Sequence, residues 1–182
     1  MKYRKIIRLP DYDYSQSGNY FITFCVNHRR CSLGQVSNQK IKLSEDGLIV
    51  EKWIKNVSSK FPEILIDSYV IMPNHIHIII EINSSIENPI YATYDKKEEF
   101  EKWRLARKNM LIPKAINYLK SNSSREINLK NNEQGNRYWQ LNYYEHIIRN
   151  EIEYQKIDQY IENNPILWKG DKFHVDATLG LP

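Results

Sequence analysis

The chain has 182 residues, of which 41% are hydrophobic and 26% are charged, with a formal net charge of +4 and a pI of about 8.9. These values are typical of one globular domain with a sizeable core. A membrane span, a secretory signal and a disulfide framework are not expected. No apolar run reaches the roughly 18 residues of a spanning helix, no apolar segment follows the basic N-terminus, and there are only two cysteines. We therefore expect a cytoplasmic protein that does not act in a membrane.

The first half of the sequence alternates strand patterns with one amphipathic helix. Aromatic and β-branched residues mark the strands, and Ser44 is a suitable N-cap for the helix. The apolar stripe expected on this helix consists of Leu48, Ile49, Trp53 and Val57. In chain order we expect a strand over 20–27, a turn and a short strand pair over 28–43, a helix over 44–60, and strands over 64–72 and 75–82.

The second half is predicted to contain a long loop, two helices and one strand. Residues 83–109 are polar and charged without a clear period, which indicates a long loop or an insertion. Asn150 and Glu153 have the spacing of a capping box at the start of the last helix, and Pro165 is expected to end that helix near Asn163. The expected elements are a helix over 111–127 with Ile112, Ile116 and Leu119 in the core, a loop over 128–137, a strand over 143–148 and a helix over 150–163.

This order of elements is the β-α-β-β-α-β order of the ferredoxin-like split fold. We therefore predict an α+β sandwich with a four-stranded antiparallel sheet, helices on one face, and an extra C-terminal helix that carries Tyr160. The expected divisions are a basic N-terminal arm over 1–19, one domain over 20–168, and a C-terminal tail over 169–182. A fold of this kind does not determine the function.

A His-x-His sequence lies on the third main strand. Because alternate side chains of a strand share a face, His75 and His77 point the same way, about 7 Å apart along the strand. Ile76 points into the opposite layer. Two imidazoles placed in this way can hold one metal ion, or they can form a packed or hydrogen-bonded pair without a ligand.

The last predicted helix carries two polar residues on one face. Tyr160 and Asn164 are four residues apart, which is the spacing of one helix face, but Pro165 disfavours a helical conformation at Asn164. Tyr160 can supply a phenolic nucleophile, and Asn164 can supply a neutral oxygen ligand for a hard cation. The alternative is a structural tyrosine with a satisfied hydroxyl, since the chain contains 13 tyrosines.

Basic and aromatic residues precede this helix. Arg137, Tyr143 and Arg149 can contact phosphates and stack on bases. The 13 tyrosines, 4 tryptophans and 26 lysines and arginines of the chain also suit the binding of unpaired nucleic acid. A tyrosine-rich core with solvated arginines explains the same composition.

A tyrosine nucleophile and a metal ion together suit the cleavage of a phosphodiester bond. A phenol is a poor nucleophile near neutral pH because its pKa is near 10, and a metal ion can polarise the phosphate and stabilise charge on the leaving 3′ oxygen. In-line attack leaves a 5′-phosphotyrosine bond and a free 3′ hydroxyl. Most of the phosphodiester energy is kept, so the strand can be rejoined without ATP.

Several motifs in order along the chain resemble the HUH-type single-tyrosine transposases, and within them the REP-associated tyrosine transposases. The segment from Asp67 to His77 resembles the HUH motif, and the segments 139–151 and 160–168 resemble the REP-associated group. Arg8-Leu9-Pro10 and Gly18-Asn19-Tyr20-Phe21 also fit. The likeness extends from about residue 4 to residue 168.

The resemblance implies a metal-dependent endonuclease and strand transferase that acts on single-stranded DNA folded into hairpins or palindromes. By motif position, His75 and His77 are metal ligands, Tyr160 is the nucleophile, and Asn164 takes the place of a polar third ligand. The implied cofactor is Mg²⁺ or Mn²⁺, and a homodimer with the tyrosine acting in cis or in trans is possible. The residues expected to contact DNA are Arg4, Arg8, Arg137, Tyr143 and Arg149.

Two features depart from the family, and other functions stay open. Residues 83–109 are longer and more charged than a minimal member needs, and Asn164 replaces a glutamine of some relatives, which shortens the reach of the third ligand. The alternatives are a non-catalytic single-stranded nucleic-acid binding protein on the same fold, and a hydrolase that uses a metal and water in place of tyrosine. If Tyr160 is not the nucleophile, Tyr143 and Tyr144 are the next candidates.

Overall fold

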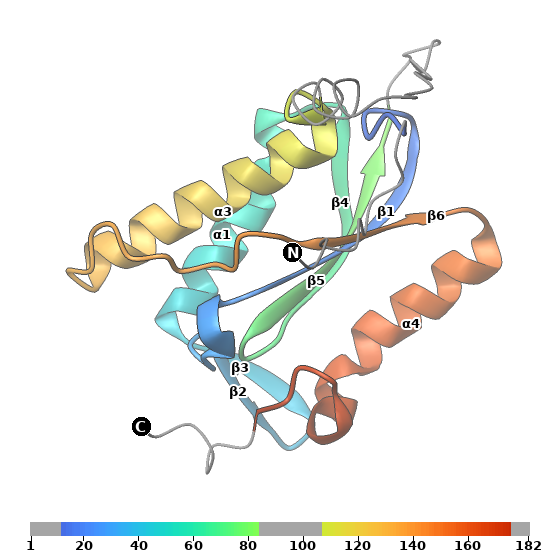
Figure 1. Cartoon of the computed structure of the whole chain (residues 1–182). Coiled ribbons are helices and arrows are strands. Elements are labelled where there is room, and N and C mark those ends of the chain that lie inside the picture. The colour runs from blue at the N-terminus through green and yellow to red at the C-terminus, as the bar shows by residue number, and fades with distance from the viewer. Residues whose placement is uncertain (1–11, 84–106, 176–182) are drawn as a thin grey trace, which may run out of the picture.

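The computed structural model describes residues 12–83 and 107–175, as drawn in Figure 1. Arg4 and Arg8 of the predicted arm lie outside the described residues, as does nearly all of the predicted loop over 83–109. In the part that is described, no helix is long and apolar enough to cross a membrane. The strands are β1 (Gly18–Cys25), β2 (Gly34–Ser37), β3 (Lys40–Leu43), β4 (Ile64–Ile71), β5 (His75–Ile82) and β6 (Tyr144–Ile148), the α-helices are α1 (Glu45–Lys60), α3 (Leu111–Lys130) and α4 (Glu151–Leu167), and the short 3-10 helices are η1 (Asn27–Arg29) and η2 (Trp168–Gly170).

Four strands form one antiparallel sheet in the order β4-β5-β1-β6. Along the chain, α1 lies between β1 and β4, after the short β2 and β3 strands. α3 lies between β5 and β6. The chain therefore has the β-α-β-β-α-β order, and the prediction of a ferredoxin-like fold is confirmed. β2 and β3 form a separate two-stranded hairpin, as expected for the short strand pair within 28–43.

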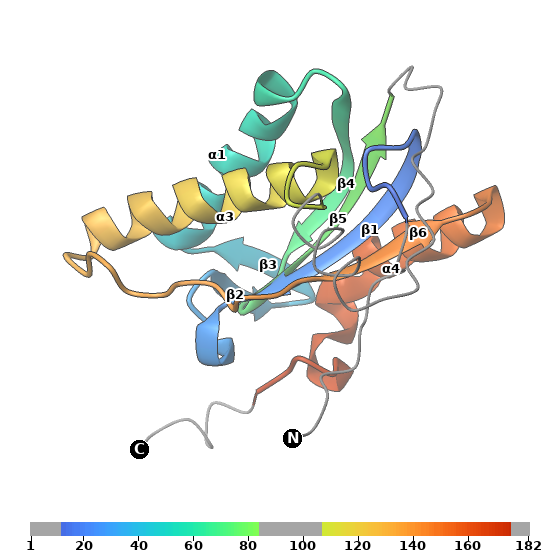
Figure 2. The same cartoon turned by 45° about the horizontal axis from the view of Figure 1, so that its top comes forward.

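Different helices cover the two faces of the sheet. α1 and α3 cover one face, and α4 covers the other (Figures 1 and 2). Ile76, Ile78 and Ile80 of β5 belong to the large core under α1 and α3. Ile79 belongs instead to a smaller cluster with Ile161 of α4. Because side chains alternate along a strand, the odd-numbered residues of β5, including both histidines, face α4.

α1 begins where predicted, but part of its expected buried face was wrong. The Ser44 hydroxyl accepts a hydrogen bond from the Gly47 N–H, as expected of an N-cap. Leu48, which was placed in the apolar stripe, is 55% exposed. A Cβ at Gly47 would lie 2.1 Å from the carbonyl oxygen of Leu33, so this side of the helix is pressed against backbone and sets how the helix is rotated. The fully buried apolar residues of α1 are Val50, Ile54 and Val57.

α4 continues past the proline that was expected to end it. The predicted end near Asn163 was wrong, because the helix runs to Leu167 with Pro165 inside its last turn. The proline removes one backbone donor, but this turn is packed against the protein, since Asn164 is only 1% exposed. Asn164 is therefore helical and shares a face with Tyr160.

The start of α4 is tied to the preceding strand. The Asn150 side chain accepts a hydrogen bond from the Glu153 N–H over 2.9 Å, as the capping-box prediction requires. The reciprocal bond is shifted by one residue, because the Glu153 carboxylate accepts the N–H of Arg149 at 2.8 Å. The same carboxylate lies 2.7 Å from Nε2 of His146 on β6. These contacts set the direction in which α4 leaves the sheet and crosses the histidines.

Candidate metal centre and nucleophile

A buried histidine pair on β5 lies beneath α4. His75 and His77 are 0% and 1% exposed, respectively, and their Nε2 atoms are 3.0 Å apart. The rings meet edge to face, with an angle of 73° between their planes. The two nitrogens therefore converge on one point, although the residues are separated by two steps along the strand.

Hydrogen bonds at Nδ1 orient both rings. Nδ1 of His75 lies 2.9 Å from the side-chain oxygen of Asn74, and the amide nitrogen of Asn74 donates to two backbone carbonyls. Because the amide oxygen can only accept, His75 carries its proton on Nδ1 and presents a lone pair at Nε2. Nδ1 of His77 lies 2.7 Å from the Thr23 hydroxyl, which can accept in the same way. Partners of this kind orient imidazoles that bind metals.

Burial keeps both imidazoles neutral. Burial is the main cause that lowers the pKa of His75 and of His77 below the usual 6.5. The Asp171 carboxylate opposes this effect at His75, whereas the positive charges of Lys172 and Arg29 add to it. At His77 the further causes that lower the pKa are His75 and Lys172. Neutral imidazoles with free Nε2 lone pairs are the form that binds a metal ion.

The depressed pKa values predict that the metal-free protein becomes less stable as the pH falls. Below pH 6.5 the unfolded chain protonates His75 and His77 while the folded chain does not, so the unfolded state binds more protons. The contribution is complete above pH 6.5 and is lost as the pH falls towards the lower folded-state values. The expected slope is up to about 1.4 kcal/mol per pH unit for each histidine. Urea unfolding in EDTA at a series of pH values measures it.

A double variant provides the control for this prediction. In His75→Ala/His77→Ala, the pH dependence below 6.5 should be shallower than in the parent protein, because the groups that titrate differently are gone. Equal slopes in the two proteins would contradict the prediction, because they would show that the folded and the unfolded chain protonate both histidines over the same pH range. The carboxylates contribute to both proteins and cancel in the comparison.

Tyr160 reaches the histidine pair from α4. Its hydroxyl lies 3.2 Å from Nε2 of His77 and 3.4 Å from a carboxylate oxygen of Asp171, to which it donates. The phenol ring packs edge-on against Phe21 and His77, with centroid distances of 6.2 Å and 5.0 Å. Burial and then the negative charge of Asp171 raise the pKa of Tyr160. These protein groups by themselves therefore keep the phenol protonated.

Asp171 is a residue of this site that the sequence analysis missed. It follows η2 in the segment predicted as a tail, and it offers an oxygen that lies with the His75 and His77 nitrogens in a group within 4.8 Å of one another. The Phe173 N–H donates to the other Asp171 oxygen over 2.6 Å, and the Phe173 ring packs 4.5 Å from that of His75. No spacing in the sequence marks Asp171, because its position depends on how the chain folds back after α4.

Asn164, the predicted third ligand, lies beside Asp171. Its amide nitrogen donates to an Asp171 oxygen at 3.5 Å. Its side-chain oxygen is buried and has no hydrogen-bond partner within the described ranges. Such an oxygen is costly to bury unless something positive approaches it. The two imidazole nitrogens and the Asp171 carboxylate form a mixed donor set of a kind that can hold a divalent cation, and the Asn164 amide group lies beside it.

The predicted DNA-contacting residues do not gather at this centre. Arg137 and Tyr143 line a groove beside α3, and Arg149 is exposed at the turn between β6 and α4. Tyr144, the other alternative nucleophile, lies on β6, which is the second strand from β5 in the sheet. Of the three tyrosines considered from the sequence, Tyr160 is the one that the fold brings to the histidines.

The model of the family described as "Transposase IS200 like" matches residues 105–164, a segment that includes Tyr160 and Asn164. An uncharacterized protein from Haemophilus influenzae is 38% identical over 176 residues, which cover 96% of this chain and 94% of that protein.

Two solved structures are similar. A REP-associated tyrosine transposase bound to a REP hairpin is 23% identical with a TM-score of 0.54, over 91% of this chain and 73% of that chain. A putative transposase from Deinococcus radiodurans is 18% identical with a TM-score of 0.45, over 81% of this chain and 91% of that chain. The first of these shares the fold described above.

Proposed function

Because the chain belongs to the HUH-type single-tyrosine transposases, the family of the IS200-like transposases, we propose that it cuts and rejoins single-stranded DNA at hairpin or palindromic sequences. In this proposal Tyr160 forms a 5′-phosphotyrosine intermediate, and a divalent ion, Mg²⁺ or Mn²⁺, is required. The family supports an enzyme of the DNA-cleaving and rejoining kind. The similar REP-associated transposase is bound to a REP hairpin, which supports the choice of substrate.

The position of the Tyr160 hydroxyl, 3.2 Å from Nε2 of His77, is the observation that carries the proposal. A nucleophile must lie beside the group that activates the phosphate. Positive charge is also close, because the Arg29 guanidinium and the Lys172 ammonium lie 5.3 Å and 4.9 Å from the centroid of the Phe173 ring, which packs on the histidines. These cations suit a phosphate at the mouth of the site.

In the proposed cleavage step, the Tyr160 oxygen bonds to the scissile phosphorus, and the bond between phosphorus and the 3′ oxygen breaks. The Asp171 carboxylate, which accepts the hydrogen bond of the phenol, orients the hydroxyl, and the phenolic proton is lost to solvent as the new bond forms. The departing 3′ oxygen takes up a proton from solvent and becomes a hydroxyl. Rejoining is the reverse reaction, in which a 3′ hydroxyl attacks the phosphotyrosine and Tyr160 recovers its proton.

The residues that would hold the ion are His75, His77 and Asp171, with Asn164 beside them. A divalent cation bound there would polarise the scissile phosphate and stabilise negative charge on the leaving oxygen. Mg²⁺ prefers oxygen ligands, whereas imidazole suits transition ions. We therefore expect Mn²⁺ to bind more tightly than Mg²⁺.

The proposed site is complete within one chain. Tyr160 and His77 contact each other in the same subunit, so the nucleophile needs no second copy to reach the histidines. We therefore propose that the tyrosine acts in cis. A homodimer is compatible with this arrangement but is not needed for cleavage.

Incubation of the full chain with labelled single strands that contain a palindrome, in the presence of Mn²⁺, tests the proposed function. A denaturing gel is expected to show a labelled product that migrates with the protein and disappears after protease treatment. EDTA should prevent its formation, because the phosphate is no longer polarised. Palindromes with differing flanks, tested side by side, show which strand is cut.

The same gel separates the competing functions. Cleaved DNA without attached protein would indicate a hydrolase that uses water, and would contradict the covalent mechanism. DNA that is bound but neither cleaved nor attached, over the tested palindromes and ions, would indicate a non-catalytic binding protein on the same fold.

A further inference from the structure

The side chain of Asn74 connects three parts of the chain at the metal centre. Asn74 lies in the turn between β4 and β5, directly before His75, and it is 0% exposed. The other two parts are the turn after β1 and the segment that follows η2. A polar side chain is costly to bury unless its atoms are bonded, so the partners of this amide show what it holds in place.

The amide nitrogen of Asn74 holds two backbone carbonyl groups. It donates to the carbonyl oxygen of Arg29 over 3.2 Å and to that of Phe173 over 2.8 Å. These two bonds use both hydrogens of the amide. They also determine which way round the amide lies, so its oxygen is directed at Nδ1 of His75, 2.9 Å away.

The backbone around Asn74 is also fixed. The carbonyl oxygen of Asn74 accepts the N–H of Val26 over 2.8 Å, and the carbonyl oxygen of Pro73 accepts the N–H of Leu33 over 2.9 Å. These bonds join the loop after β1 to the turn between β4 and β5. The Asn74 side chain therefore starts from a well-held backbone and can position its partners.

The bond to Phe173 connects Asn74 with a second possible metal ligand. The N–H of Phe173 donates to one oxygen of Asp171 over 2.6 Å. Asp171 is the carboxylate that lies together with the nitrogens of His75 and His77. The bond from Asn74 to the Phe173 carbonyl therefore holds the turn that presents this carboxylate to the histidines.

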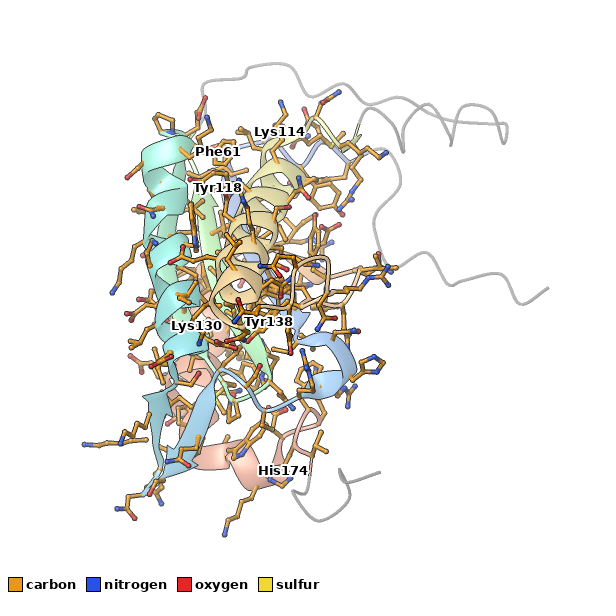
Figure 3. All side chains as sticks on the ribbon, turned by 90° about the vertical axis from the view of Figure 1, so that its left-hand side faces the viewer. Phe61, Lys114, Tyr118, Lys130, Tyr138 and His174 are labelled. Carbon is orange, nitrogen blue, oxygen red and sulfur yellow. The ribbon has the colours of Figure 1, made fainter. Side chains whose placement is uncertain are left out.

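A second contact brings the same turn towards β1. The Arg29 guanidinium donates to the carbonyl oxygen of Lys172 over 3.3 Å and lies over the Phe173 ring. Figure 3 shows His174, the next residue, at the end of the molecule where the β2–β3 hairpin lies. The Arg29 bond is exposed to water, whereas the bonds of the Asn74 amide are partly buried. The Asn74 amide is therefore the firmer of the two links.

The other histidine has a partner that makes no such link. Nδ1 of His77 lies 2.7 Å from the hydroxyl of Thr23, its neighbour on β1. Within residues 12–83 and 107–175 the Thr23 side chain makes no other hydrogen bond. Thr23 therefore orients one imidazole and has no part in placing Asp171.

We propose that Asn74 is a positioning residue that sets two donors of the metal centre at once; this inference rests on the metal site of the proposed function. Its amide oxygen orients His75, and its amide nitrogen holds the turn of Asp171. Because one side chain serves both donors, its loss loosens both of them, although neither ligand is itself altered.

The binding of Mn²⁺ without DNA tests the inference in a double-variant cycle. Asn74→Ala should weaken binding by about 100-fold, because both donors are loosened. In the Asp171→Ala background the same change should cost only about 10-fold, because the orientation of His75 is all that is left to lose. Electron paramagnetic resonance of free Mn²⁺ measures the four dissociation constants in the full chain.

Thr23→Val is the matched control, because it removes the partner of His77 and leaves the turn of Asp171 unchanged. It should weaken Mn²⁺ binding by about 10-fold in the parent protein and by the same factor in the Asp171→Ala background. Asn74→Ser keeps a hydroxyl and leaves a smaller space than alanine does. It is measured in the same cycle, with the same sign of coupling expected, so that the test does not depend on the folding of Asn74→Ala.

Nitrogen NMR of the metal-free protein follows the orientation of His75 directly. In the parent protein this ring should hold its proton on Nδ1, where the Asn74 oxygen accepts it. In Asn74→Ala and Asn74→Ser the ring should divide between the two neutral forms. A general loss of stability does not change this ratio in the folded protein, so the measurement separates positioning from a structural role.

Equal losses of Mn²⁺ affinity for Asn74→Ala in the two backgrounds would overturn the inference, because Asn74 would then not act through Asp171. An unchanged proton position on His75 would overturn it as well. The expected losses, without any covalent product from the parent protein in Mn²⁺, would contradict the proposed cleavage and leave the role of Asn74 in place. A parent protein that binds no Mn²⁺ would overturn both.

Discussion

Replacing Tyr160 by phenylalanine is expected to abolish the covalent protein–DNA product while hairpin binding stays unchanged. The variant lacks the oxygen that bonds to phosphorus, so product formation should fall by at least about 1,000-fold. The hydroxyl makes only long contacts, 3.2 Å to His77 and 3.4 Å to Asp171, so the free energy of unfolding should change by no more than about 1 kcal/mol. A denaturing gel and an anisotropy titration measure the two properties.

Tyr154→Phe is the matched control for this variant. Tyr154 lies on the same helix, but its hydroxyl bonds to Asp67 and not to the histidines. This variant should still form the product. A product that survives in Tyr160→Phe would show that another tyrosine is the nucleophile, and Tyr143→Phe and Tyr144→Phe would then identify it.

Replacing either histidine of the pair by alanine is expected to abolish cleavage and to weaken the binding of Mn²⁺. Each of His75→Ala and His77→Ala removes one of two nitrogens that converge at 3.0 Å, and the remaining donors do not form a chelate of the same strength. The loss of Mn²⁺ affinity should exceed the roughly 10–100-fold loss that follows removal of an outer partner. Electron paramagnetic resonance of free Mn²⁺ measures the affinity without any DNA.

Other variants define how far the metal centre extends. His146→Ala removes a histidine that pairs with Glu153 on the same face of the sheet, and it should retain both Mn²⁺ affinity and cleavage. Asp171→Asn should weaken Mn²⁺ binding because it removes the negative charge of the donor set, and Asn164→Ala should do so less, because only a neutral oxygen is lost. Unchanged Mn²⁺ affinity in both histidine variants would contradict the metal role of the pair.

Mixing the two kinds of variant tests whether the tyrosine acts in cis. Tyr160→Phe keeps the histidines, and His77→Ala keeps the tyrosine, so a mixture would regain activity only if one chain served the other. Because the two groups meet within one chain, no product is expected from the mixture. Product from the mixture would show exchange of α4 between subunits.

Local periodicity explains why most of the elements could be predicted. The alternation of His75, Ile76 and His77 requires that both imidazoles share a face, and Ile76 is indeed in the opposite core. Ser44 and Asn150 mark two helix starts because their side chains accept bonds from the first turn. The exposed Leu48 shows the limit of this reasoning, since the close contact of Gly47 with the Leu33 backbone, which no local pattern shows, sets the rotation of the helix.

By itself, the sequence determined the order of strands and helices, the shared face of the histidine pair, and the one-turn spacing of Tyr160 and Asn164, because each depends on residues close together in the chain. Only the tertiary structure decided that Asp171 joins the pair, that α4 continues through Pro165, and that the turn before the pair is bonded to the segment after η2. These features depend on contacts between segments far apart in sequence. Such contacts arise from packing, in which burial of Asn164 and the contact of the tilted Phe173 ring with His75 outweigh local preferences.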